Sequence, residues 1–256
     1  MMRRVARTVA ALIAPSALLA VWEADGRLDR LPDYLPPPSS IGKALVELIG
    51  SGEIFAQSGA SLLRAALGFA IGSVVGVLLG LVAGSSRPVR DLLEPVIIAL
   101  NPIPKIAFLP IFVIAFGLGH GSKIAIIALS VFFPVFVASL EGLMAVPQHL
   151  NWVARSMGAG GVRLFFRVGL PASLPSIFSG LRIGLALSFI VLFAAELMGG
   201  NSGLGYLITT AESGVRFDLM LAAIAVIAIF GFAADRALLR VRAAVLRGRV
   251  HGGAEP

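Results

Sequence analysis

Six long apolar segments decide what this chain can fold into. They run from Ala6 to Trp22, Ser61 to Gly84, Leu92 to Phe116, Ile124 to Val146, Ile177 to Met198 and Leu219 to Leu239. Each is close to the roughly 17–25 residues that cross the hydrocarbon core of a bilayer. Because lipid satisfies no backbone polar group, each segment is predicted to be helical. The sequence thus predicts an all-α, polytopic membrane protein with six transmembrane helices in one domain over residues 1–256.

The composition excludes a soluble fold of this length. Of the residues, 57% are hydrophobic and only 14% are charged, whereas soluble domains carry about 25% charged residues. The chain has no cysteine, so disulfides and thiol chemistry are excluded.

The charges lie at the ends of the apolar segments and indicate orientation. If the N-terminus is cytoplasmic, that side receives thirteen arginines, including those of a basic tail over residues 240–256, and the other side receives five basic residues. Positive residues accumulate on the cytoplasmic side of membrane proteins. Both termini are therefore predicted to be cytoplasmic, and the first segment is interpreted as a retained signal anchor, with cleavage as the alternative.

Residues 23–57 form the predicted external segment between the first two spans. The stretch "LPPPSS" stiffens its first half, and "SSIGKALVELI" is typical of a short amphipathic helix opened by a serine cap. We expect this helix to lie along the outer membrane face; a plain connector is the alternative.

The second apolar segment carries glycines at a fixed spacing of four. They are Gly68, Gly72, Gly76, Gly80 and Gly84. Such a smooth helical face lets a neighbouring backbone approach closely. The pattern predicts a packing seam, with a functional hinge as the alternative.

The third apolar segment is predicted to break near its middle. Pro102 and Pro104 remove backbone hydrogen bonds, and Asn101 and Lys105 flank them. Irregular backbone at membrane depth is tolerated where it is buried in protein or lines a cavity. These four residues are therefore predicted to border a translocation pathway, although Lys105 could instead extend to the interface.

Three further ionisable residues lie near the ends of the spans. Glu196, at the outer end of the fifth segment, is predicted to cap a loop or to pair across the rim of the pathway. Arg64 and Arg182 are expected to reach headgroups or loop carbonyls rather than a solute.

The polar stretch over residues 147–171 predicts a helix, a glycine turn and a second helix. In "HLNWVARSMG" apolar residues recur at helical spacing, and Gly158 is placed to end the helix. A second amphipathic repeat follows and is predicted to end at Leu170-Pro171. We expect the apolar stripe to rest against the spans, while Trp152, beside Arg155, faces outward like a docking residue or lies at headgroup level.

This stretch resembles the cytoplasmic "EAA" loop of permease subunits of bacterial ATP-binding-cassette importers. Ala154 matches the second alanine, Gly158 the glycine, Val168 the isoleucine position and Leu170-Pro171 the ending, whereas Trp152 and Val153 depart from the pattern. The resemblance implies that this loop couples the permease to an ATPase. The coupling residues it implies are Trp152, Ala154, Arg155, Gly158, Ala159, Val168, Leu170 and Pro171.

The resemblance extends over nearly the whole chain. "NPIPKIAFLPIF", "FFPVFVASLEG" and "AAELMGGNSGLGYLI" are similar to the nitrate, sulfonate, taurine and bicarbonate branch of these permeases. It implies a type I importer fold in the bacterial cytoplasmic membrane, a second and identical permease chain, two cytosolic ATPases that hold ATP and Mg²⁺, and an extracytoplasmic solute-binding protein. The implied solute is a small anion, or a pyrimidine or vitamin-like compound.

The sequence gives only weak support to other classes of function. No Gly-x-x-x-x-Gly-Lys-Ser/Thr motif is present, so the chain itself is not expected to bind ATP through such a loop. An ion-coupled secondary transporter would need more ionisable residues within its spans and internal repeats; a non-transporting scaffold is the remaining alternative.

His120, His149 and His251 lack ligand spacing, so we expect neither a metal site nor an enzyme. Arginines beside the last span are explained by topology and anionic lipid rather than nucleic acid.

Overall fold

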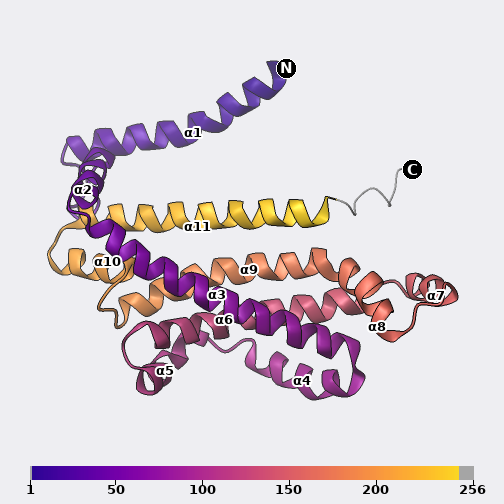
Figure 1. Cartoon of the computed structure of the whole chain (residues 1–256). Coiled ribbons are helices and arrows are strands. Elements are labelled where there is room, and N and C mark those ends of the chain that lie inside the picture. Colours follow the sequence, from indigo (N-terminus) through magenta and orange to yellow (C-terminus); the bar gives the residue numbers. More distant parts are fainter. Residues whose placement is uncertain (1, 248–256) are drawn as a thin grey trace.

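The computed structural model describes residues 2–247, and within them it is helical with no strand. The main elements are α1 (Met2–Arg27), α2 (Pro38–Gly50), α3 (Glu53–Ser85), α4 (Arg87–Leu100), η1 (Lys105–Phe108), α5 (Leu109–Phe116), α6 (His120–Met144), α7 (Gln148–Ser156), α8 (Gly161–Leu164), η2 (Phe165–Gly169), α9 (Leu170–Leu197), α10 (Leu204–Ser213) and α11 (Phe217–Leu246). Helices α3, α6, α9 and α11 run along the bundle, with α7 and α8 at one end and α2 and α10 at the other (Figure 1).

The core of the bundle is the packing of α6 between α3 and α9. A Cβ built on Gly72 would lie 2.4 Å from the Ala128 carbonyl oxygen, and one on Gly80 would lie 2.5 Å from that of Phe136. On the other side of α6, a Cβ on Gly180 would meet the Ala138 Cβ at 2.5 Å. Only glycine permits these backbones to approach so closely. The predicted glycine packing seam is confirmed, and its partner is α6.

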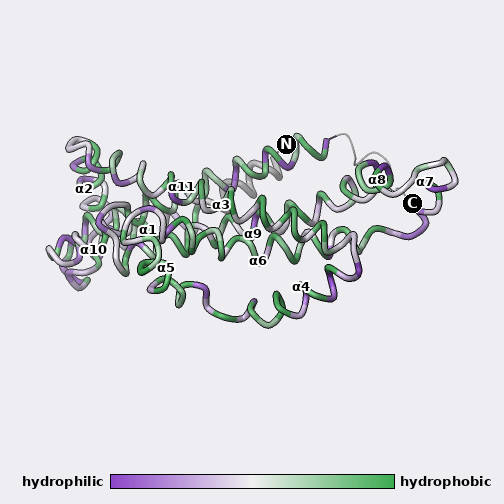
Figure 2. Tube along the Cα trace, turned by 60° about the horizontal axis from the view of Figure 1, so that its bottom comes forward, coloured by the Kyte–Doolittle hydropathy of each residue, from purple (hydrophilic) through white to green (hydrophobic). Residues whose placement is uncertain are grey.

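Four helices are long and apolar enough to cross a membrane, or five if one bent pair is counted as a span. The four are α3, the continuous helix over Gly161–Leu197, α6 and α11. Figure 2 shows hydrophobic residues along these helices and hydrophilic residues gathered toward the ends of the bundle. Helix α1, the first predicted span, is not among the candidates, so the sixth span stays a prediction.

The bent pair lies in the third predicted segment. Helix α4 ends at Leu100, helical structure resumes at Lys105, and the two parts meet at 92°. The predicted break is confirmed at the predicted residues. Its cause is Pro102 and Pro104, neither of which offers a backbone N–H to continue the helix.

The amphipathic helix predicted in the external segment is present as α2, but its cap differs from the prediction. The helix begins at Pro38 with no side-chain cap of its own. The backbone N–H of Ser39 instead donates to the Glu23 carboxylate of α1 at 2.9 Å. This hydrogen bond, with those from the Ser39 and Arg27 side chains, lowers the pKa of Glu23. Ala44 and Leu48 of α2 are buried in a cluster with α10 and α11.

Candidate functional site

The polar loop between the fourth and fifth predicted segments projects from one end of the bundle. Helix α7 ends at Ser156, and Gly158 adopts a left-handed backbone with φ of +81°. The amide of Gly158 donates to the Arg155 carbonyl, and that of Ala159 to the Ala154 carbonyl. These bonds satisfy the last carbonyls of α7, so the predicted helix and glycine turn are both confirmed.

The second half of this loop differs from the prediction, because the helix does not end at Leu170-Pro171. Helix α8 passes through the π-helical turn η2 directly into α9, and Pro171 lies in the first turn of α9. In η2 the Leu170 amide donates to the Phe165 carbonyl, five residues back. A π-turn shifts the hydrogen-bond register, and a proline in a first helical turn costs no intrahelical bond. The loop is therefore joined to α9 by continuous helical structure.

The apolar side chains of α7 do not rest against the spans, contrary to prediction. Val153 is 57% exposed and Met157 81% exposed. Val162 and Phe166 of the following helices are exposed as well. Helix α7 contacts mainly α8 and η2 and lies at the end of the bundle (Figure 1). Trp152 is 67% exposed, so the loop exposes several large apolar side chains among its polar ones.

The predicted coupling residues gather on this loop. Trp152, Arg155 and Gly158 are exposed, while Ala154, Ala159, Val168, Leu170 and Pro171 are half-buried. We call α7, the turn and α8 the loop surface. Its exposed aromatic and apolar side chains next to arginine have the composition of a protein interface.

The broken third segment borders a cavity of about 540 Å³ against α6 and α9. Asn101 and Lys105 line it, together with Ser130, Phe133 and Glu141 of α6. The Lys105 ammonium donates to the carbonyls of Leu100 and Asn101 and lies 4.2 Å from the centre of the Phe133 ring. Lys105 thus caps the end of α4 and exposes part of its charge to the cavity. Pro102 and Pro104, also predicted to border the pathway, are exposed at the break.

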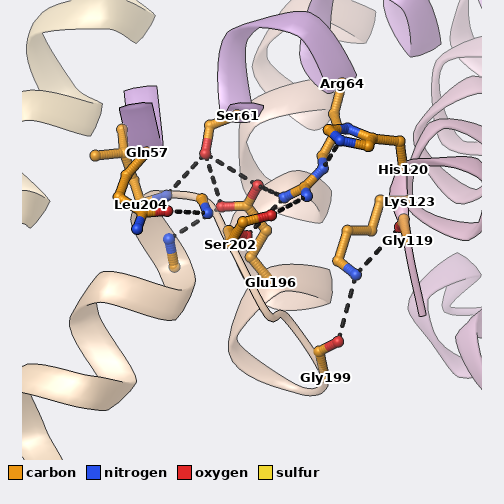
Figure 3. A network of polar contacts seen from close by, with 12 residues as sticks. Gln57, Ser61, Arg64, Gly119, His120, Lys123, Glu196, Gly199, Ser202 and Leu204 are labelled. Carbon is orange, nitrogen blue, oxygen red and sulfur yellow. Dashed lines mark hydrogen bonds and ion pairs between the residues drawn. The ribbon is translucent and has the colours of Figure 1, made fainter. Parts of the chain in front are cut away.

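Glu196, which was predicted to cap a loop or to line a pathway rim, is 1% exposed. Its carboxylate accepts hydrogen bonds from Ser61, from Arg64 at 2.6 Å and from the Gly205 amide at 3.0 Å (Figure 3). It therefore caps the start of α10. Glu196 lines a small apolar pocket between α3, α9, α10 and α11 and is not among the residues that line the cavity at Lys105.

Arg64 is fully buried, and the expectation that it reaches a headgroup is wrong. Besides Glu196, it donates to the Ser202 carbonyl and hydroxyl and to Nδ1 of His120 (Figure 3). Lys123 is also buried, with its ammonium on the carbonyls of Leu118, Gly119 and Gly199. The sequence signals for this network were two isolated charges near the ends of apolar segments, Arg64 and Glu196, but their pairing was not predicted because they lie far apart in the chain.

The remaining ionisable groups form no metal centre within residues 2–247. Arg182 does not reach a headgroup or carbonyl as expected, but pairs with Asp235 of α11 at 2.7 Å. His120 and His149 are exposed, and His251 lies outside the described residues. Together these features describe a polytopic membrane protein: a helical bundle with four or five candidate spans, a broken segment beside a cavity, and a projecting polar loop.

Similarity to known proteins identifies the family of this membrane protein. Residues 54–246 match the family model described as "Binding-protein-dependent transport system inner membrane component". The chain belongs to this family. It is a permease subunit of an ABC transport system that works with an ATPase and a solute-binding protein, and it is not itself an enzyme.

Two curated relatives resemble most of the chain. The putative aliphatic sulfonates transport permease protein SsuC of Bacillus subtilis (strain 168) is 36% identical over 88% of this chain and 82% of its own. The taurine transport system permease protein TauC of Escherichia coli (strain K12) is 37% identical over 85% of this chain and 81% of its own.

A solved structure shows the same fold at lower identity. A chain of the MetNI methionine ABC transporter, in an inward facing conformation, matches with a TM-score of 0.59 at 21% identity. The match covers 73% of this chain and 91% of that chain.

Proposed function

We propose that this chain is the translocation subunit of an ATP-driven importer in a bacterial cytoplasmic membrane. Two copies form the pathway, two cytosolic ATPases bind ATP and Mg²⁺ beneath them, and a solute-binding protein delivers solute from outside. The relatives named for sulfonates and taurine support a small solute with an anionic group. A pyrimidine-type solute is the second candidate, since a formylaminopyrimidine transport permease is 34% identical.

The observation that carries this proposal is the loop surface. Trp152 and Met157 are exposed on a short helix whose loop runs through η2 into a helix that crosses the bundle. Seated on an ATPase, this surface would transmit movement of the ATPase to α9 as a rigid-body tilt. The coupling residues implied by the sequence fall on or beside this surface, which supports their role.

The cavity at the broken segment is the proposed pathway. Asn101 and Lys105 offer an amide and a positive charge to a passing solute, and the break at Pro102 and Pro104 exposes backbone groups there. Glu196 is not part of this proposal, because it is engaged in the buried network at the other end of α9.

We also propose six spans with both termini in the cytoplasm. The chain has no cysteine, so single cysteines report topology directly. Met157→Cys on the loop surface should react with an impermeant maleimide only after the cells are opened, whereas Ser40→Cys on α2 should react in intact cells. The opposite pattern would invert the orientation.

The coupling role is tested by co-purification of the partner ATPase. Trp152→Ala should reduce the amount of ATPase retained by about tenfold, as expected for an aromatic anchor worth more than 1 kcal/mol at an interface. Trp22→Ala, the other tryptophan, on α1, is the matched control and should retain the ATPase. Equal retention by both variants would remove the coupling assignment.

A further inference from the structure

The histidine at the start of α6 contacts the buried ion-pair network, at the end of the bundle that carries α10. His120 is the first residue of α6, and Nδ1 of its ring accepts a hydrogen bond from Nε of Arg64 at 3.1 Å (Figure 3). The Arg64 side chain is 0% exposed, whereas His120 is open to solvent. This hydrogen bond therefore joins a buried charge on α3 to a ring that water can reach.

The hydrogen bond requires the neutral form of the imidazole ring. A ring nitrogen accepts a hydrogen bond only while it carries no proton, and both nitrogens are donors in the charged form. Among the described residues, His120 is the only acceptor for the Nε–H of Arg64, whose Nη groups bond to Glu196 and Ser202. Protonation of His120 would therefore turn two N–H donors toward each other and leave a buried donor without an acceptor.

The charges around His120 are mainly positive. Arg64 faces the ring from α3, and Lys123, three residues further along α6, is 1% exposed. The carboxylate of the network is Glu196 of α9, which is already bonded to Arg64. The neighbouring segments, α5 and residues 198–205, contain no ionisable side chain. A proton on His120 would thus add a third positive charge beside one carboxylate, and this repulsion is stronger next to buried groups than in water.

The contact lies beyond the end of the glycine packing seam. Gly68 is the first glycine of the seam, where a new Cβ would meet Ile127, whereas nothing lies within 4 Å of a Cβ on Gly59. Past the seam, polar contacts tie α6 to its neighbours: His120 accepts from α3, and the Lys123 ammonium donates to the Gly199 carbonyl after α9. Loss of the first contact would free the start of α6 and the turn before it.

We infer that His120 and Arg64 form a pH-sensitive contact, which holds the start of α6 to α3 while the histidine is neutral and releases it when the histidine is protonated. Histidine is the side chain that changes its charge between about pH 5 and 8, so the signal is acidification of the medium at this end of the bundle. With the orientation proposed above, that medium is extracytoplasmic. The contact itself depends neither on the solute nor on the ATPase, so this inference goes beyond the proposed function.

The test compares thermal unfolding of the full-length protein in detergent at pH 8 and pH 5.5. Because the hydrogen bond exists only with neutral His120, its stabilising effect is present at pH 8 and is lost as the pH falls through the histidine range. The unfolding midpoint of wild type should fall by at least about 3 °C, the shift expected when a chain of this size loses one such bond. His120→Asn offers an acceptor oxygen that takes up no proton, so its midpoint should fall by less than about 1 °C.

A control and a local measurement complete the test. His149→Asn, at the exposed histidine of α7, should keep the pH dependence of wild type. The chain has no cysteine, so a nitroxide label on Leu118→Cys reports motion in the turn before α6 without a histidine variant. Its spectrum should sharpen between pH 8 and pH 5.5, whereas a label on Met157→Cys should not respond. Equal pH dependence of wild type and His120→Asn, or an unchanged spectrum at position 118, would overturn the inference.

Discussion

The Arg64 guanidinium lies 2.6 Å from the Glu196 carboxylate, and neither side chain is more than 1% exposed. This pair joins α3 to α9 and, through Ser202 and Gly205, fixes the loop that leads into α10. Removing one member leaves the other charge buried without its partner.

Arg64→Met should therefore destabilise the protein by about 3–5 kcal/mol, the usual cost of breaking a buried ion pair. The double variant Arg64→Met with Glu196→Leu should recover much of the loss, because neither member of the pair then leaves a buried charge without its partner. Arg27→Met, at the exposed pair with Glu23, is the control and should cost less than about 1 kcal/mol. Thermal unfolding in detergent measures all three; a double variant no better than the single would contradict the account.

The glycine seam makes a prediction within a single helix. Gly72→Ala should destabilise the bundle by about 1–3 kcal/mol, because its new Cβ would press on the Ala128 carbonyl. Gly59→Ala is the matched control on α3, where nothing lies within 4 Å of the new Cβ. At Gly59 only the higher helix propensity of alanine matters, so this substitution should raise the free energy of unfolding by up to about 1 kcal/mol. Equal effects on the unfolding midpoint would argue against the seam.

The turn after α7 depends on backbone conformation rather than space. Gly158→Val would place a β-branched residue at φ of +81°, which is sterically unfavourable. We expect a displaced α7 and at least a tenfold loss of ATP-driven uptake. Gly160→Val is the control, since Gly160 has φ of −88° and open space around it. Uptake reduced equally in both variants would show that bulk, not the turn, matters.

The contact between α1 and α2 should depend on pH. The pKa of Glu23 is lowered in the folded state by the Ser39 amide, so its stabilising effect is present above the ordinary carboxyl pKa and is lost as the pH falls through the lowered value. The unfolding midpoint of Glu23→Gln should lie below that of wild type at pH 7, and the two should converge toward pH 3. Asp33→Asn, an exposed carboxyl on the connector, should show no such convergence.

Features with a local cause were predictable from the sequence. The apolar lengths, the break at Pro102 and Pro104, and the turn at Gly158 each follow from residues close together in the chain. The Arg64–Glu196 pair was missed because its members are 132 positions apart; Arg64 alone resembles a residue reaching for an interface, and Glu196 alone resembles a loop cap or a residue at the rim of a pathway. Leu170-Pro171 looked like a helix end because a π-turn, which lets a helix pass into that proline, leaves no recognisable pattern.

The central claim is that this chain transmits force from an ATPase and has no energy source of its own. Solute uptake into proteoliposomes measures this directly, with the permease reconstituted either alone or with its ATPase and solute-binding protein. The account predicts uptake only when all three components and ATP are present. Accumulation of solute by the permease alone, driven by an ion gradient, would contradict it.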